Sequence, residues 1–114
     1  MVHNIWSEKI DNILKVGVSL HSIGVDNWAL TKSQAFDVIA KFKADGVPIL
    51  GGDVYCERDN CIEISYDNWW CDATPGEAES EYVVRSNAVA LEYVKNYLCN
   101  DEKILYAFVP KVTI

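Results

Sequence analysis

The sequence lacks the features that mark a membrane or secreted protein. It has no run of about 18 apolar residues, the length that a membrane-spanning helix needs. Its first residues, MVHNIWSEKI, include polar side chains where a signal peptide requires an unbroken apolar segment. We therefore expect a cytoplasmic protein without membrane contact. The sequence also shows no internal repeat and no low-complexity segment.

Histidine is scarce, which limits the catalytic sites that the chain can form. The two histidines, His3 and His21, lie outside the segment that holds the cysteines, and no spacing pairs either with a nucleophile. Phosphate-binding loops of the GxxxxGK[ST] or GxGxxG type are absent. Carboxylate pairs arise by chance in a chain with 17 acidic residues. We predict no catalytic residue, no cofactor and no metal site.

Paired CxxC motifs are absent as well. Cys56, Cys61, Cys71 and Cys99 are separated by four, nine and 27 residues, which fits no metal knuckle. Without a secretory signal, these cysteines are interpreted as reduced thiols that pack as small hydrophobic residues. The main alternative is a disulfide between Cys56 and Cys61 across the end of a hairpin.

Basic residues are few, with 10 Lys and Arg against 17 Asp and Glu, and the formal net charge is −7. The excess lies in residues 53–81, which hold nine acids and only Arg58 as a base. Nucleic acid is an unsuitable partner, because phosphate binding requires clustered Lys and Arg. A basic partner is the natural complement, and a solvated acidic face that keeps the protein soluble is an equal alternative.

The hydrophobic patterns predict a mixed order of helices and strands. Helices are expected over residues 5–15, 32–45 and 86–99, with a short helical piece that docks through Trp28 and Leu30. Thr31 and Gln34 have capping-box spacing, and Ser86 is a candidate cap. Strands are expected over residues 48–56, 61–70 and 104–112, and an acidic loop over 72–81. The last strand suits an edge position, because Pro110 lies near its end.

This order predicts an α+β fold. We expect a small, mostly antiparallel sheet with a central hairpin, packed against about three helices, and one domain over residues 1–114. In the second strand, Ile62, Ile64 and Tyr66 alternate with polar residues, which predicts that one face is buried. Trp69 and Trp70 are consecutive, so one ring is expected in the core and the other outside. Both rings buried, or a stacking platform for sugars or bases, are the alternatives.

The run Gly51-Gly52-Asp53 stands at the start of a strand. It resembles the signature of nucleotide cyclases only superficially, since that chemistry needs further acidic metal ligands. We expect the glycines to permit a bend or bulge. Asp53 is expected either to tie that bend by hydrogen bonds or to face a partner.

Taken together, several motifs resemble the immunity protein 40 family of bacterial polymorphic toxin and contact-dependent inhibition systems. They are NWAL at 27–30, PILGGDVY at 48–55, YDNWW at 66–70, EYVVRS at 81–86 and EYV at 92–94. The likeness covers roughly residues 15–110, and GGDVY followed by DNW is its most specific part. The family signature corresponds here to Gly51, Gly52, Asp53, Tyr55, Asn68 and Trp69.

The resemblance implies a non-enzymatic cytoplasmic antidote that binds the C-terminal effector domain of a cognate toxin. Many such toxins attack nucleic acid through basic surfaces, which an acidic segment would complement. We predict a monomer or weak homo-oligomer with a partner surface of acidic and aromatic residues. These are Asp53, Tyr55, Glu57, Asp67, Trp69, Trp70, Asp72, Glu77, Glu79 and Glu81.

Two other functions remain open on the sequence. A small ligand-binding or enzymatic domain would use a concave pocket lined by Trp69 and Trp70 with Asp53 or Glu57. A structural subunit of a homo-oligomer would expose an apolar patch.

Overall fold

The computed structural model describes residues 4–98 and 103–112. Within these ranges the helices are α1 (Glu8–Leu14), α2 (Lys32–Ala44), α3 (Glu79–Asn96) and the short 3-10 helix η1 (His21–Ile23). The strands are β1 (Val18–Ser19), β2 (Trp28–Ala29), β3 (Ile49–Arg58), β4 (Cys61–Trp70) and β5 (Lys103–Pro110). β1 and β2 form a small antiparallel sheet, and the other three strands form a larger one. The predicted α+β class is confirmed.

The larger sheet has the order β4-β3-β5, and all of its pairs are antiparallel. β3 and β4 form the predicted hairpin, which turns at Asp59 and Asn60. Both turn residues have positive φ, 52° and 65°, as a primed two-residue turn requires. β5 is the other outer strand, as predicted. Part of its outer side is covered, because Leu30 and Tyr106 exchange backbone hydrogen bonds of 2.7 and 2.8 Å.

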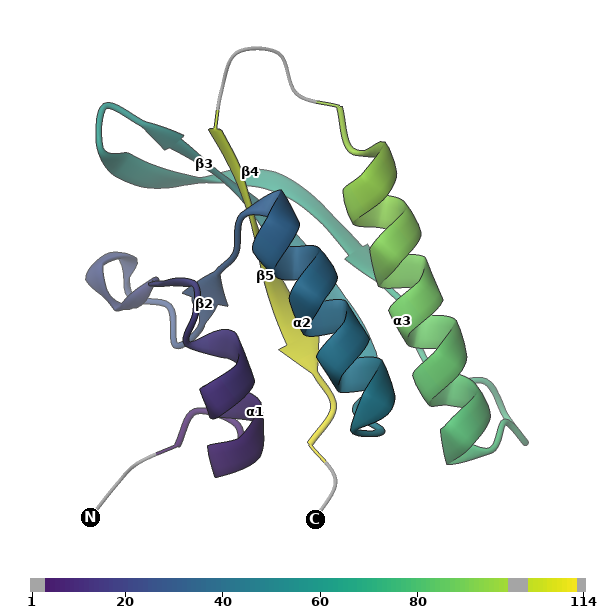
Figure 1. Ribbon diagram of the computed structural model, residues 1–114. Coiled ribbons are helices and arrows are strands. Elements are labelled where there is room, and N and C mark those ends of the chain that lie inside the picture. The colour runs from purple at the N-terminus through teal and green to yellow at the C-terminus, as the bar shows by residue number, and fades with distance from the viewer. Residues whose placement is uncertain (1–3, 99–102, 113–114) are drawn as a thin grey trace.

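The helices α2 and α3 lie side by side over one face of the larger sheet (Figure 1). The main core fills the space between these layers and includes Phe42, Val54, Val94 and Phe108, all fully buried. A smaller cluster on the opposite face joins Tyr55 and Leu105 to Leu20 and Ala29. The β1–β2 region therefore covers only part of that face.

The helix α2 follows the predicted capping box. The Thr31 hydroxyl accepts a hydrogen bond from the Gln34 amide at 3.2 Å, and the Gln34 side chain accepts one from the Thr31 amide at 3.0 Å. Lys41 and Lys43 stand in the last turn, where cations suit the helix dipole. The predicted helix over 32–45 is confirmed within one residue.

The segment around Trp28 differs from its prediction as a helical piece, because Trp28 belongs to strand β2. The side-chain nitrogen of Asn27 donates a hydrogen bond to the Phe108 backbone carbonyl at 2.9 Å. The side-chain oxygen of Asn27 accepts one from the Trp28 backbone amide at 2.8 Å. These contacts, together with pairing to β1, hold the backbone extended. The first helix is shorter than predicted, because the Ser7 hydroxyl accepts from the Ile10 amide and caps it there.

The helix α3 begins at Glu79, seven residues before the predicted start at Ser86. The Glu81 carboxylate accepts from the Ala78 amide at 3.0 Å, and acidic residues in a first turn suit the helix dipole. Ser86 is fully buried, and its hydroxyl accepts from the Ile49 amide at 3.0 Å. α3 ends at Asn96, and the predicted end at Cys99 lies outside the described residues. No helix over 4–98 or 103–112 has the length and apolar character to cross a bilayer.

Candidate functional site

The two glycines of β3 lie opposite the two tryptophans of β4. Gly51 pairs with Trp70 and Gly52 with Trp69. A Cβ atom on Gly52 would overlap the Trp69 indole, and one on Gly51 would lie 2.6 Å from Cε3 of Trp70. Glycine is therefore required here by the close approach of the indoles and of backbone carbonyls, since a Cβ on Gly51 would overlap the Trp69 carbonyl oxygen and one on Gly52 would lie 2.8 Å from the Ala107 carbonyl oxygen. Backbone irregularities flank the pair, one between Ile49 and Gly51 and one after Asp53.

The two indoles point to opposite faces of the sheet, as their consecutive positions predict. Trp69 is buried, with its ring stacked on Tyr93 at 4.4 Å between centroids and edge-on to Phe108 at 5.8 Å. Trp70 is 60% exposed. The alternative with both rings buried is wrong. The two rings also cannot line one pocket together, which removes the geometry of the proposed Trp69–Trp70 ligand site.

Asp53 lies on the same face as Trp70. Gly51, Asp53 and Tyr55 are spaced two residues apart on β3 and so share one face of the sheet. The residue of β4 that pairs with Asp53 is Asn68. The diagonal neighbour of Asp53 across the hairpin is Trp70, a separation of roughly 7 Å in an antiparallel pair. The carboxylate is half-buried, and it has no hydrogen bond or ion pair among the described residues. Burial raises its pKa, and the pKa of Tyr55 is raised by burial and then by the charge of Asp53.

β4 carries a bulge next to this pair. Asp53 pairs with Asn68 and Tyr55 with Ile64, so three residues of β4 stand opposite Val54 alone. The middle one, Tyr66, has a φ of 71° and is 81% exposed. A bulky residue in this conformation costs about 1 to 3 kcal/mol, and such strain gathers at binding sites.

The bulge is held by hydrogen bonds from both sides. The Ser65 hydroxyl donates to the Val54 carbonyl at 2.8 Å and accepts from the Asp67 amide at 3.2 Å. The Tyr97 hydroxyl, just beyond α3, donates to the Asp67 carboxylate at 2.6 Å. Burial, followed by this hydrogen bond, raises the pKa of Tyr97 to about 12. These hydrogen bonds therefore hold the bulge in place, and the bulge presents the exposed Tyr66 side chain to solvent.

The predicted half-buried face of β4 is confirmed only at Ile62, which is half-buried and packs against the smaller cluster. Ile64 is 43% exposed and Tyr66 81% exposed, although both belong to the apolar side of the alternation. Ile64 pairs with Tyr55 and so lies on the face of the sheet opposite to α2 and α3, which the β1–β2 region covers only in part. The fold therefore leaves part of an apolar pattern of the sequence unburied. We call Asp53, Ile64, Tyr66, Asn68 and Trp70 the Trp70 surface.

Most predicted acidic site residues outside this surface have partners within the chain. Glu57 pairs with Lys103 at 3.2 Å, and Glu79 pairs with Lys111 at 3.2 Å. Glu81 caps α3 and Asp67 accepts from Tyr97, as described above, while Asp72 is exposed. Tyr55 and Trp69 lie in the interior, so the Trp70 surface is defined without them.

Arg85 ties the acidic loop to α3, and the sequence analysis did not single it out. Its guanidinium donates to the Glu77 carboxylate at 2.7 and 2.8 Å, to the Asp72 carbonyl at 2.6 Å and to the Cys71 sulfur at 3.1 Å. The hydrogen bond from Arg85 is the largest cause that lowers the pKa of Glu77 to about 2. The only feature of the sequence that could have predicted this contact is the position of a single arginine just after an acid-rich segment. Tyr66 and Tyr97 were not predicted as site residues, because no local sequence pattern indicates a bulge or the residue that stabilises it.

The cysteines do not form the alternative bridge. Cys56, Cys61 and Cys71 are free, and the strand register places Cys61 opposite Arg58 while Cys56 lies opposite Glu63. Cys99 lies outside the described residues. Over residues 4–98 and 103–112, no three His, Cys, Asp or Glu side chains gather closely enough to hold a metal ion.

The chain matches a known protein family. Residues 19–110 match the model of the family described as immunity protein 40. The matched range includes all of β3, β4, α3 and β5, and therefore the whole Trp70 surface. No curated protein and no solved structure matches the chain.

Proposed function

The chain belongs to the immunity protein 40 family, and from this premise we propose that it neutralises a cognate bacterial toxin by binding the toxin's C-terminal effector domain at the Trp70 surface. The family implies an immunity role and a toxin partner. The location of the contact, the basic character of the effector, the cytoplasmic site of action and the absence of catalysis are parts of our proposal.

One observation carries the choice of surface: the half-buried carboxylate of Asp53, which has no partner within residues 4–98 and 103–112, lies beside an exposed indole. Removing part of the hydration of Asp53 is unfavourable in the free protein unless another charge compensates. A Lys or Arg side chain of the effector domain would supply that charge and could also stack on Trp70. Unpaired carboxylates with a raised pKa often mark functional sites.

The surroundings of this pair support the same surface. Ile64, Tyr66 and Trp70 expose apolar area that the chain does not bury itself. Exposed aromatic residues ringed by polar groups are typical centres of protein interfaces. The net charge of −8 over residues 53–81 would attract a basic partner to the hairpin that bears them.

The test of the function is co-expression with the C-terminal effector domain of a candidate cognate toxin. We expect the wild-type chain to preserve growth and to co-purify with the effector in a one-to-one complex. Loss of growth despite expression of the folded chain, or the absence of a complex, would refute the immunity role.

The test of the surface compares two charge-neutralising variants in the same assay. Asp53→Asn keeps the side-chain shape and removes the charge, and we expect the dissociation constant for the effector to rise by about tenfold. Asp37→Asn makes the same change at an exposed position of α2 and serves as the matched control. Equal affinity of the two variants would exclude Asp53 from the contact.

A further inference from the structure

The outer side of α3 exposes apolar residues that the Trp70 surface does not include. Val84 is 54% exposed, Leu91 42% exposed, and Ala88 between them is exposed as well. Glu81 and Lys95 continue the same three-and-four spacing at either end, so the five residues lie along one side of the helix. We call Glu81, Val84, Ala88, Leu91 and Lys95 the α3 stripe. The buried residues of α3, including Tyr82, Ala90 and Val94, face away from it.

A shallow apolar groove runs beside the α3 stripe. Its lining includes Ala88, Val89, Tyr93, Tyr97 and Leu98, together with Arg85, Glu92 and Asn96. Leu98, just beyond the helix, is 92% exposed. Figure 1 shows α2 along one side of α3, whereas its outer side in this view has no described helix or strand beside it and only the loop between β4 and α3 near its lower end. Contiguous apolar surface of this kind marks an interaction site in a soluble chain.

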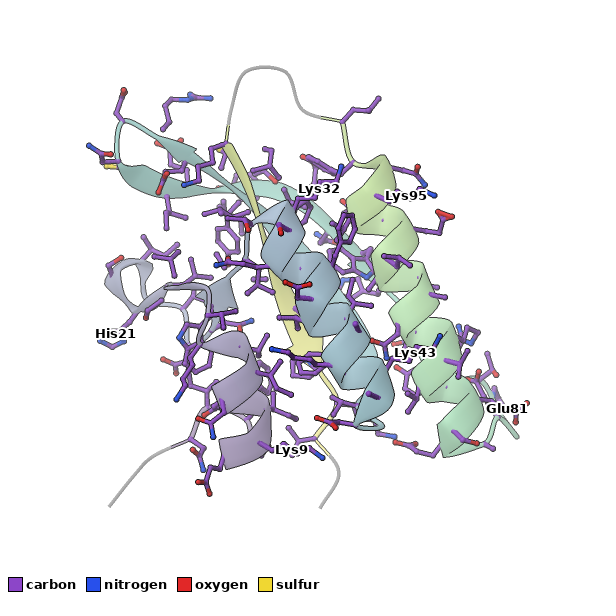
Figure 2. All side chains as sticks on the ribbon, viewed as in Figure 1. Lys9, His21, Lys32, Lys43, Glu81 and Lys95 are labelled. Atoms are coloured by element: carbon purple, nitrogen blue, oxygen red, sulfur yellow. The ribbon has the colours of Figure 1, made fainter. Side chains whose placement is uncertain are left out.

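The charges of the stripe have an order that suits a second copy of the chain. Glu81 lies near the N-terminal end of α3 and Lys95 near its C-terminal end (Figure 2). The two are 14 residues apart, a rise of roughly 21 Å along a helix. Ala88 stands at the midpoint. If two α3 helices align antiparallel about Ala88, each Glu81 lies beside Lys95 of the second copy.

The same alignment brings the apolar residues together. Val84 and Leu91 of each copy pack against the apolar part of the α3 stripe of the other copy. The small side chain of Ala88 allows the two helices to approach closely. The aliphatic stem of Lys95 can cover Val84 of the second copy while its ammonium group reaches Glu81. A two-fold axis perpendicular to the two helices produces this antiparallel arrangement, and two-fold symmetry is the commonest symmetry of homo-oligomers.

We propose that the chain self-associates through the α3 stripe, with a second copy docked antiparallel on it. The charge of the stripe favours a copy over the basic effector, because the stripe carries one acid and one base and so offers a basic protein no excess of negative charge. A single helix pair makes an interface at the small end of the known range, so the dimer is weak, with a dissociation constant of about micromolar order.

Sedimentation equilibrium of the full chain over a wide range of concentration tests the proposal. We expect the mean mass to rise from that of a monomer toward that of a dimer. Leu91→Glu places a carboxylate in the apolar centre of the interface and should weaken association by about tenfold or more. Val16→Glu is the matched control, since Val16 is 51% exposed and the change in charge is the same. A monomer at every concentration, or equal behaviour of the two variants, would overturn the proposal.

A charge exchange tests the antiparallel pairing itself. Glu81→Lys places lysine against lysine in its own dimer, and Lys95→Glu places glutamate against glutamate, so each variant alone should associate less than the wild type. A mixture of the two restores both opposite-charge pairs in the heterodimer, and we expect the mean mass to rise on mixing. No rise on mixing would contradict the proposed alignment. Circular dichroism of each variant checks that α3 is intact, because Glu81 also caps this helix.

The outcome is separable from that of the proposed function. Leu91→Glu leaves Asp53 and Trp70 unchanged, so we expect it to bind the effector with wild-type affinity. If Leu91→Glu abolishes effector binding and the wild-type chain stays monomeric, the α3 stripe belongs to the effector interface and self-association is refuted.

Discussion

The side chains of Trp69 and Trp70 account for the glycines that face them. Each indole lies over the backbone of β3 from its own side of the sheet, and a methyl group on either glycine would intrude into it. Alternation along a strand was enough to predict one ring inside and one outside. Which ring is inside could not be predicted, because the apolar residues Ile62 and Ile64 share the face of Trp70, whereas the helices cover the other face.

We expect Gly52→Ala to destabilise the chain by about 3 kcal/mol, because the added methyl group overlaps the six-membered ring of Trp69. Trp69→Phe shortens that side chain, and the Trp69 indole N–H has no acceptor among the described residues, so this change breaks no hydrogen bond there. Urea denaturation of both single variants and the double variant gives the coupling energy. Strictly additive effects would show that the clash is not with Trp69.

Glu77 gives a pH-dependent prediction at the same scale. Its folded pKa of about 2 lies below the ordinary value of 4.5, so its stabilising effect is complete above that value and is lost as the pH falls toward 2. We expect Glu77→Gln to lower Tm at neutral pH, and we expect the difference in Tm from the wild type to shrink as the pH falls from 4.5 through about 2. Thermal denaturation across this range is the measurement. Glu63→Gln, at an exposed position of β4, is the control, and an equal effect in both variants would contradict the role of the Arg85 contact.

At the scale of elements, local signals predicted α2 and the β3–β4 hairpin well and failed where tertiary contacts decide. The capping box of Thr31 and the turn at Asp59 and Asn60 depend only on residues that are close together in the sequence. The start of α3 was missed because the segment EYVVRS contains β-branched residues that favour strands, while Tyr82 and Val83 bury themselves against the core as part of a helix. The bulge of β4 has no local signal, since part of its support comes from Tyr97, 30 residues away.

Tyr97→Phe tests whether the bulge presents Tyr66. The change removes the hydrogen bond to Asp67 and keeps the ring, so we expect a stability loss of about 1 kcal/mol. Amide hydrogen exchange of residues 65–67 should become faster, and dissociation of the effector should accelerate. Tyr93→Phe removes the hydroxyl of the neighbouring ring, which stacks on Trp69, and is the control. If exchange at the bulge is the same in both variants, the Tyr97 contact does not hold it.

At the scale of the whole molecule, the concentration of acidic residues in one segment could be predicted from the sequence. Which of these acids pair within the chain and which do not could not be predicted. Several acids of residues 53–81 are committed to intramolecular pairs with Lys103, Lys111 and Arg85. These pairs leave Asp53 as the half-buried carboxylate of the segment without a partner among the described residues. The family match agrees with the motifs around GGDVY and DNW, and it spans nearly the range that the resemblance covered.

The negative field makes a kinetic prediction for the whole molecule. We expect the association rate with the effector to fall by roughly tenfold between low and physiological salt, while the dissociation rate changes little. Stopped-flow or surface binding at several salt concentrations measures both rates. An association rate that is independent of salt would show that the acidic segment does not steer the encounter.

Hydrogen exchange of the chain, with and without the effector domain, tests the central claim most directly, because it maps the contact without any mutation. The account predicts that binding slows exchange in residues 51–53 and 64–70 and leaves α2 unchanged. Slowed exchange confined to other elements, with β3 and β4 unaffected, would contradict the assignment of the Trp70 surface as the site where the toxin is bound.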